Sequence, residues 1–419
     1  MTVDTLDALE RRDPQEREHD LMARLPQLLA RAQSAPGWAA ILDGVDPAQV
    51  TSRAALAELP ITRKADLKSL QKRAMPFGGL AVTPVGQLGR VFVSPGPIFD
   101  PEGRGPDWWR FARPMYAAGI RAGGLLQNCF SYHFTPAAFM VEGGAARIGC
   151  AVIPAGAGQT EMQVQAIVDL RPDTYVGTPS FLRIIIEKAR EMDADISCLQ
   201  RAVMGAEALP ESLRAWFREH GVPHVFQTYA SADIGSVAYE TATDGVLNPG
   251  MMLDEDVILE IVRPGSGEPV APGDIGEIVI TLFNPDYPLI RFATGDMSAL
   301  LVDTPPSRCG RTNQRIRGWL GRADQTTKVR AMFVHPTQVD NITRRHPEIL
   351  KARLVVSGRM ANDVMTLRCE VRSTPAPEKQ ALIIESIREV TKLRGEVEFV
   401  ARGALPSDGV LIEDARDYR

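Results

Sequence analysis

The sequence predicts an α/β protein in which a large N-terminal domain with several mixed sheets, residues 1–323, precedes a small α+β C-terminal domain, residues 324–419. Strand-like and helix-like segments alternate between residues 125 and 191, which is typical of a largely parallel sheet covered by helices. After about residue 250, short apolar runs are separated by glycine and proline turns, which indicates antiparallel hairpins. A length of 419 residues leaves room for two or three domains.

Charge and composition exclude several classes of protein. The chain has 47 Lys and Arg against 52 Asp and Glu, well mixed, unlike the basic surface of a nucleic-acid-binding protein. Its five cysteines show no C-x-x-C spacing, which indicates a reducing cytoplasm. The acidic N-terminus lacks the pattern of a secretory signal, and charges interrupt the longest apolar stretch. We therefore expect a cytoplasmic protein that binds neither nucleic acid nor a membrane.

The N-terminal segments are predicted to be helical. Leucines recur at helical spacing between about residues 16 and 35, as in an amphipathic surface helix. In LPITRKADL, residues 59–67, Thr62 precedes a charged helical run, so we expect it to be an N-cap.

The alternating region reads segment by segment. LLQNCF is strand-like, FMVEGGAARIG is helix-like, and CAVIPAG is expected to be a buried strand that ends in a glycine-rich turn. Residues 161–192 then predict a helix, a short strand, a turn and a second helix.

The last third of the chain is predicted to contain short strands. DVILEIVRP, GEIVITLF and MSALLVD are the first of them. The basic, turn-rich residues 305–324 form the best candidate for a domain boundary. Beyond it, ARLVVSGR, TLRCEVRS and GEVEFVARG surround a helix in QALIIESIREVTKL, which predicts a domain of ordinary size.

Residues 91–103, VFVSPGPIFDPEG, form an unusual turn at a place where many nucleotide enzymes have a phosphate-binding loop. Pro95 and Pro97 remove two backbone N–H donors. Asp100 and Glu102 add negative charge, and each repulsion of a phosphate near 4 Å would cost about 1–4 kcal/mol. The turn is therefore poorly suited to a triphosphate.

A succession of motifs resembles the phenylacetate–CoA ligase branch of the adenylate-forming superfamily. The order and spacing of these motifs agree from about Leu59 to Asp340. The matching stretches are residues 127–163, VGTPSFL, AVMGAEALPESLR, YASADIGSVAYE, PLIRFATGD and GRADQTTKVRAMFVHPTQVD. Such enzymes activate a carboxylic acid with ATP, release pyrophosphate and pass the acyl group to a thiol, while a small domain rotates. The resemblance implies ATP or AMP, Mg²⁺, an aromatic acid and coenzyme A, and it allows a homodimer.

The resemblance places the adenosine on three motifs. The turn of Gly205, Ala206 and Glu207 would frame the adenine, and Tyr229 would stack on it. Asp296 in RFATGD matches the acid that accepts hydrogen bonds from the ribose hydroxyls. A structural turn is the alternative reading of both MGAE and TGD.

Four further residues match the phosphate and metal groups. Ser94 and Gly96 are what is left of the phosphate loop, and Arg322 in GRAD resembles the arginine near ribose and phosphate. Asp233 stands at the glutamate position of the tyrosine motif and is the expected Mg²⁺ ligand. For Arg322 the alternative is an exposed ion pair of little energetic value.

The remaining matches concern domain movement and the acyl group. Asp324 resembles the hinge, and Lys328 matches the lysine presented in the thioester-forming state. Tyr132 falls where the family has an aromatic gate and is the third expected catalytic residue, with Lys328 and Asp233. The expected acyl pocket is formed by Tyr132, His133, Phe134, Phe139 and Gly143, although core packing is the alternative for the phenylalanines.

Three departures from the family pattern all affect activation by ATP. They are the proline-rich loop, Ala232 in place of a hydroxyl residue, and Val410 in place of the lysine that contacts the α-phosphate. Loss of such a cation commonly costs about 2.7–4 kcal/mol of transition-state stabilisation. The zinc-type cluster of some relatives is reduced to Cys309, so we expect no zinc.

Three interpretations stay open from the sequence. The first is an acid-activating enzyme that binds AMP or an acyl-adenylate better than ATP. The second is a protein without catalysis that binds an aryl acid, AMP or acyl-adenylate as a sensor, carrier or scaffold. The third is a complete ligase in which Arg104, Lys64 or Arg90 replaces the phosphate-loop lysine.

Overall fold

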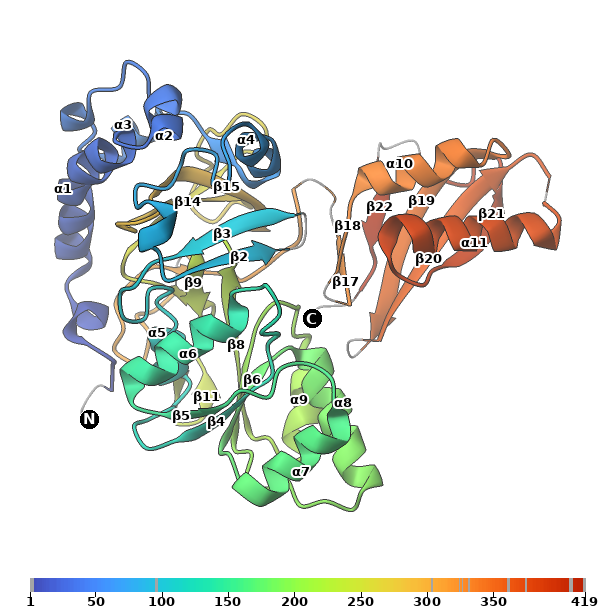
Figure 1. The fold of residues 1–419 in the computed structure, drawn as a ribbon, viewed down its shortest axis with the longest axis horizontal. Helices are drawn as coiled ribbons and strands as arrows, with labels where there is room; N and C mark the ends of the chain where they lie inside the picture. Colours follow the sequence, from blue (N-terminus) through green and yellow to red (C-terminus); the bar gives the residue numbers. More distant parts are fainter. Residues whose placement is uncertain are drawn as a thin grey trace. The chain divides into compact units, whose positions relative to one another are not determined.

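The computed structural model describes residues 4–94, 97–302, 304–323, 325, 327–330, 332–359, 362–373, 375–406 and 410–416 (Figure 1). Two compact units divide the chain. One contains Met1–Ala206 with Phe217–Leu320, and the other contains Glu207–Trp216 with Gly321–Arg419. Several mixed sheets and their helices confirm the predicted α/β class.

The large unit is built around an eight-stranded sheet within the described residues, in the order β16-β12-β9-β8-β7-β6-β4-β5. Neighbouring strands are parallel from β5 through β4, β6 and β7 to β8, and the pairs β8–β9, β9–β12 and β12–β16 are antiparallel. Their bounds are β4 Leu125–Asn128, β5 Ala151–Ile153, β6 Thr174–Gly177, β7 Arg201–Met204, β8 His224–Ser231, β9 Gly235–Tyr239, β12 Met251–Leu253 and β16 Arg315–Ile316.

Helices connect the parallel strands, as the alternating pattern predicted (Figure 1). They are α6 Ala137–Ile148, α7 Thr160–Leu170, α8 Pro179–Glu191 and α9 Glu211–Glu219. The strand at CAVIPAG is present but is not buried. It becomes β5, the edge strand of the sheet, where Ala151 is exposed and its two neighbours are half-buried.

A second sheet of the large unit has the order β1-β15-β14-β13. Its strands are β1 Thr62–Arg63, β13 Val257–Val262, β14 Gly276–Leu282 and β15 Leu289–Ser298. The antiparallel pairing of β13, β14 and β15 confirms the expected hairpins, although among the described residues of MSALLVD only Met297 and Ser298 belong to a strand. Two hairpins complete the strands that the structure describes in this unit: β2 Arg90–Ser94 with β3 Ile98–Glu102, and β10 Ala242–Thr243 with β11 Val246–Leu247.

The N-terminal helices cover the second sheet. The predicted amphipathic helix is α1, Pro14–Gln33, and its Leu25 and Leu29 are fully buried in the same core as the sheet. Burial of such a leucine contributes about 1.5–3 kcal/mol relative to exposure. The other short elements are η1 Ala8–Arg11, α2 Pro36–Ile41, η2 Pro47–Gln49, α3 Arg53–Ala57, η3 Lys64–Asp66, α4 Leu67–Arg73, η4 Val85–Gln87 and α5 Ala112–Ala117.

Thr62 is not the N-cap that the sequence pattern indicated. It lies in β1 opposite Phe292 of β15, and Arg63 occupies the N-cap position of η3 instead. The parallel pairing with a strand far along the chain outweighs the local capping preference. It also places Lys64 directly after β1, beside the strand that contains Asp296.

The small unit contains the sheet β21-β20-β19-β22 and the hairpin of β17 and β18. Apolar residues of α10 and α11 pack with the sheet in one core. The bounds are β17 Thr327–Val329, β18 Met332–Val334, α10 Pro336–Arg345, β19 Ile349–Arg359, β20 Asn362–Val371, α11 Pro377–Thr391, β21 Glu396–Ala401 and β22 Ile412–Asp414. The strands and helix predicted after residue 350 are confirmed.

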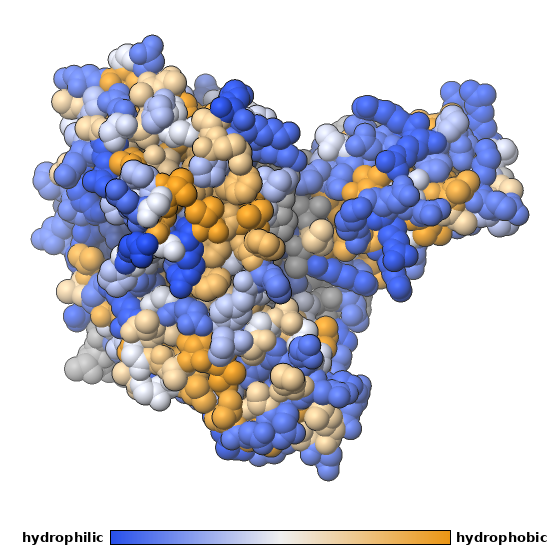
Figure 2. All heavy atoms as spheres, in the orientation of Figure 1, coloured by the Kyte–Doolittle hydropathy of each residue, from blue (hydrophilic) through white to orange (hydrophobic). Residues whose placement is uncertain are grey.

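None of the helices within the described ranges is both long and apolar enough to span a membrane. On the face in Figure 2, hydrophilic residues surround smaller hydrophobic patches.

Candidate functional site

Lys64, which is half-buried, forms an ion pair with the buried Asp233 in the large unit. The Lys64 ammonium donates to Asp233 Oδ2, which also accepts a hydrogen bond from Ser231 Oγ at 3.1 Å. The Asp233 side chain is 1% exposed. Its second oxygen, Oδ1, is buried without a hydrogen-bond partner. The structure therefore brings a lysine that lies outside every family motif into contact with the expected metal ligand.

Asp100 of the phosphate-loop hairpin lies close to this pair. It is 1% exposed on β3 and accepts a hydrogen bond from Ser94 Oγ on β2. Burial, together with the nearby carboxylate of Asp233, raises the pKa of Asp100 to about 8. Gly96 lies outside the described residues. Asp100, which was expected to repel phosphate, is thus buried close to Asp233, the expected Mg²⁺ ligand.

Two neighbouring segments hold the hairpin in place. On α4, the Gln71 side chain accepts from Phe99 N at 2.9 Å and donates to Phe99 O at 2.8 Å. On the other strand, Val93 N donates to Phe134 O at 2.8 Å. The hairpin that contains Asp100 is therefore held by α4, which precedes it in the sequence, and by the segment at Phe134, which follows it.

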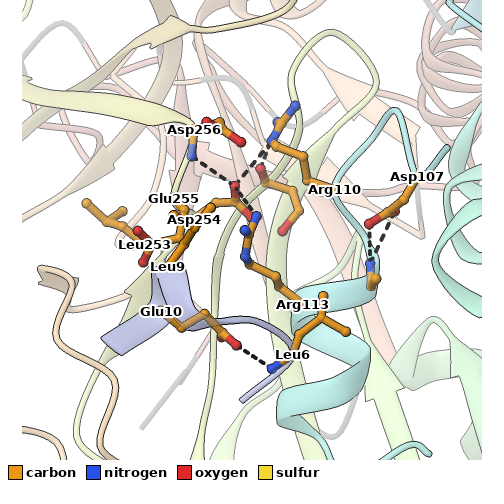
Figure 3. A network of polar contacts seen from close by, with 12 residues as sticks. Leu6, Leu9, Glu10, Asp107, Arg110, Arg113, Leu253, Asp254, Glu255 and Asp256 are labelled. Atoms are coloured by element: carbon orange, nitrogen blue, oxygen red, sulfur yellow. Dashed lines mark hydrogen bonds and ion pairs between the residues drawn. The ribbon is translucent and has the colours of Figure 1, made fainter. Parts of the chain in front are cut away.

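Arg110 fixes the turn that contains Asp233. Its guanidinium donates to the carbonyl oxygens of Ile234 and Ser236, the latter at 2.9 Å. Figure 3 shows Arg110 and Arg113 converging on Asp254, at 3.4 and 3.5 Å. Because Asp254 is fully buried, these attractions are weakly screened by solvent. Sequence reasoning did not identify Arg110, because its spacing matches no motif.

Asp296 is oriented by two donors from different segments. Tyr229 Oη donates to its Oδ2 at 2.8 Å, and Trp319 Nε1 donates to its Oδ1 at 3.0 Å. The structure thus brings together two residues that the sequence assigned to the nucleotide. Trp319 was not predicted, and its place just before GRAD is the signal that could have indicated it.

The turn after β7 has an unusual backbone. Ala206 adopts φ +67°, a left-handed conformation that is uncommon for a residue with a Cβ. Gly205 is buried beside Thr228 and Phe130. A strained non-glycine residue at a strand-to-helix turn is typical of binding sites, which favours the nucleotide reading over an ordinary turn.

The expected acyl pocket is assembled only in part. Tyr132 and Phe139 are in edge-to-face contact, with ring centroids 5.4 Å apart. Tyr132 Oη donates to Glu142 Oε1 at 2.7 Å and accepts from Asn128 Nδ2 at 2.9 Å. Burial and the hydrogen bond to Glu142 raise the pKa of Tyr132. Sequence reasoning missed the two polar partners, which had no motif signal.

The other predicted pocket residues lie elsewhere on this segment. His133 is exposed, and Phe134 is 71% exposed at φ +59°. A Cβ at Gly143 would contact the backbone of Asp107, so Gly143 faces the turn before α5. Tyr132 and Phe139 are therefore the pair that the structure brings together.

In the small unit, Lys328 lies half-buried on β17, and its carbonyl oxygen accepts from Arg416 Nη1 at 2.8 Å. Val410, at the missing lysine position, accepts a hydrogen bond from Arg353 Nε at 3.1 Å through its carbonyl oxygen. Nearby, Lys351 Nζ donates to Pro406 O at 2.6 Å. The hinge candidate Asp324 lies outside the described residues, and Arg322 and Glu207 are half-buried.

Within the described part of the chain, no three His, Cys, Asp or Glu side chains form a group that could hold a metal ion. Cys309 Sγ lies 3.0 Å from Ser307 Oγ, and the hydrogen bond between them contributes to a lowered pKa of the Cys309 thiol. The oxygen ligands near Asp233 suit a hard cation that takes its other ligands from phosphate or water.

The AMP-binding enzyme family matches residues 125–282. Over 409 residues the chain is 32% identical to a phenylacetate-coenzyme A ligase of Thermus thermophilus, covering 93% of this chain and 90% of the relative. It is 28% identical to the Escherichia coli protein of the same name, covering 87% and 85%.

Solved structures share the fold at lower identity. A 2-hydroxyisobutyryl-CoA ligase, in complex with 2-HIB-AMP and CoA, superposes with a TM-score of 0.82 at 24% identity, covering 98% of this chain and 92% of that chain. The amide bond synthetase McbA of Marinactinospora thermotolerans gives 0.56 at 16% identity, covering 93% and 92%.

Proposed function

Because the chain belongs to the phenylacetate–coenzyme A ligase family of adenylate-forming enzymes, we propose that it activates an aromatic carboxylic acid as an acyl-adenylate and transfers the acyl group to coenzyme A. The observation that supports this most directly is the arrangement of Tyr229, Asp296 and Trp319. Both donors fix the Asp296 carboxylate in one orientation, as a ribose-binding acid requires.

The phosphate end of the site is proposed to use Lys64 instead of a loop lysine. Lys64 contacts Asp233, the residue proposed to bind Mg²⁺ near the phosphates. Such a cation would stabilise negative charge that develops on the α-phosphate when the carboxylate attacks it and pyrophosphate leaves. This assignment favours the complete ligase among the three interpretations from the sequence.

The acyl end is proposed to lie at Tyr132 and Phe139. Their edge-to-face contact provides an aromatic wall, which favours an aryl acid over a short aliphatic one. The hydroxyl of Tyr132 is held by Glu142, so the ring has a defined position.

The second half-reaction is proposed to depend on movement of residues 324–419 about Asp324. The thiolate of coenzyme A would attack the acyl carbon, and AMP would leave with the electron pair of the broken acyl–phosphate bond. Lys328 is the residue proposed to face the reaction in that state.

Purified protein with Mg-ATP, a panel of aryl acids and coenzyme A tests this function directly. Release of AMP and pyrophosphate that depends on one acid is the expected result, and omission of coenzyme A should leave an enzyme-bound acyl-adenylate. If no acid of the panel causes release of AMP and pyrophosphate, in a preparation that still binds AMP, the proposed catalysis is contradicted.

One set of observations favours a second function, the binding of an aryl acid, AMP or acyl-adenylate without turnover. Asp100 is buried in the loop that should accept phosphate, and Val410 replaces the adenylation lysine. Calorimetric binding of AMP and aryl acid, combined with no release of pyrophosphate, would support this function.

A further inference from the structure

Residues 317–320 are bound to the end of β15. Leu320 N donates to Met297 O at 2.9 Å, and Ser298 Oγ donates to Gly318 O at 2.6 Å. Ser298 is fully buried, so this second bond is shielded from water. The end of β15 therefore holds residues 317–320, which we call the anchor segment, against the sheet.

The anchor segment is where the chain leaves the large unit. Leu320 is the last residue of that unit, and the small unit continues at Gly321. Gly321 has φ +126°, which residues with a Cβ rarely adopt. Among the described residues other than its chain neighbours, no heavy atom lies within 4 Å of the position that a Cβ would occupy. The backbone is therefore held through Leu320 and has the conformational freedom of glycine directly after it.

Trp319 connects the anchor segment to Asp296, the proposed ribose-binding acid. Its Nε1 donates to Asp296 Oδ1 at 3.0 Å, and Tyr229 Oη donates to the other carboxylate oxygen at 2.8 Å. Trp319 is half-buried and packs against the core that contains Tyr229. A donor on each oxygen fixes the plane of the carboxylate, so the orientation of Asp296 depends on the position of Trp319.

The two donors have different positions in the fold. Tyr229 lies on β8, between two neighbouring strands of the eight-stranded sheet, and its side chain is buried. Trp319 lies one residue before the end of the large unit, in a segment that belongs to no strand. Of these two donors, Trp319 is the one whose backbone leads directly into the small unit. A change where the chain leaves the large unit can therefore reach the ribose site through Trp319.

We propose that Trp319 is a positioning residue that couples ribose binding at Asp296 to the attachment of the anchor segment on β15. With nucleotide bound, the ribose hydroxyls and the Trp319 N–H hold the same carboxylate, and the anchor segment stays on β15 while the chain beyond Gly321 moves. The inference rests on the proposed function, because it takes Asp296 as the ribose-binding acid. Such coupling is reciprocal, so detachment of the anchor segment weakens nucleotide binding by the same factor.

Hydrogen exchange of the full chain, followed by mass spectrometry with and without AMP, measures the attachment directly. The Leu320 amide exchanges when its bond to Met297 O opens. The variant is Trp319→Phe, which keeps an aromatic ring and removes the N–H that Asp296 accepts. In wild type, saturating AMP should slow exchange of peptides that contain residues 317–320 by about fivefold or more, the lower end of typical coupling. In Trp319→Phe, AMP should leave this exchange unchanged, and the Kd for AMP measured by calorimetry should rise by about the same factor.

Trp108→Phe is the matched control. Trp108 Nε1 donates to Asp286 Oδ2 at 2.7 Å, so this variant also removes an indole donor from an aspartate, at a place outside the nucleotide motifs. It should retain the slowing of exchange by AMP and the wild-type Kd. Loss of both in Trp108→Phe would assign the effect to general destabilisation and overturn the proposal. So would equal slowing by AMP in Trp319→Phe and wild type, or wild-type exchange that AMP does not change.

The same measurements separate the coupling from the proposed activity. If no acid of the panel causes turnover while AMP slows exchange in wild type but not in Trp319→Phe, the proposed activity fails and the coupling stands. If acid-dependent turnover occurs while AMP slows exchange equally in both proteins, the coupling alone is refuted. A wild-type protein that binds no AMP refutes both, because the coupling requires a nucleotide at Asp296.

Discussion

Asp296→Ala should weaken the binding of AMP to this protein without unfolding it. The substitution removes the carboxylate that Tyr229 Oη and Trp319 Nε1 hold at 2.8 and 3.0 Å. Hydrogen bonds to a charged acceptor contribute about 1.5–3 kcal/mol each. Loss of one such bond from a ribose hydroxyl corresponds to an increase in Kd of roughly 10- to 150-fold, since about 1.4 kcal/mol is a factor of ten.

The matched control is Asp286→Ala. Asp286 also accepts from a tryptophan and a hydroxyl, from Trp108 Nε1 at 2.7 Å and Thr83 Oγ1 at 2.6 Å, but it belongs to none of the proposed nucleotide motifs. Its removal should cost comparable stability and leave the Kd for AMP unchanged.

Isothermal titration calorimetry with AMP, on variants whose thermal unfolding has been measured, gives both quantities. If Asp296→Ala binds AMP within twofold of wild type, the ribose assignment is wrong. If Asp286→Ala weakens AMP binding as much, the effect comes from general destabilisation and the reasoning is refuted.

Three further results are expected. Lys328→Ala should slow thioester formation while acyl-adenylate formation is retained, as single-turnover assays of each half-reaction would measure. Glu10→Ala should cost about 3–5 kcal/mol of unfolding free energy in urea titrations, because the buried Arg311 guanidinium, 2.6 Å from Glu10 Oε1, loses its partner (Figure 3 shows Glu10). Burial raises the pKa of Asp107 to about 6, so the folded chain holds a proton between about pH 4 and 6 that the unfolded chain releases. Stability should therefore fall by up to ~3 kcal/mol as pH rises through that window, and this dependence should be absent from Asp107→Asn in urea titrations at each pH.

Each of these has a clear contrary result. Equal losses in both half-reactions of Lys328→Ala would place the lysine outside the thioester step. A Glu10→Ala variant as stable as wild type would mean that Arg311 finds another acceptor. A shared pH dependence in wild type and Asp107→Asn would assign the titration to another group.

The alternation of strands and helices between residues 125 and 191 was readable because it depends on local spacing. The 3.6-residue period of a helix and the two-residue period of a strand can be recognised without knowing how the rest of the chain folds. The sequence predicted the burial of those strands less well. CAVIPAG is apolar like an internal strand, yet the strand order places β5 at the edge of the sheet. Thr62 has the sequence context of an N-cap, and pairing with β15 makes it a strand residue instead.

By itself the sequence determined the family, because the motifs retain their order and spacing along most of the chain, and it proposed Asp233, Asp296 and Tyr229 as site residues. Only the tertiary structure decided which side chains meet. Lys64 lies on a short helix after β1, Asp100 lies on a hairpin, and Asp233 follows β8. Their contacts depend on the pairing of distant strands, and no local pattern records that pairing.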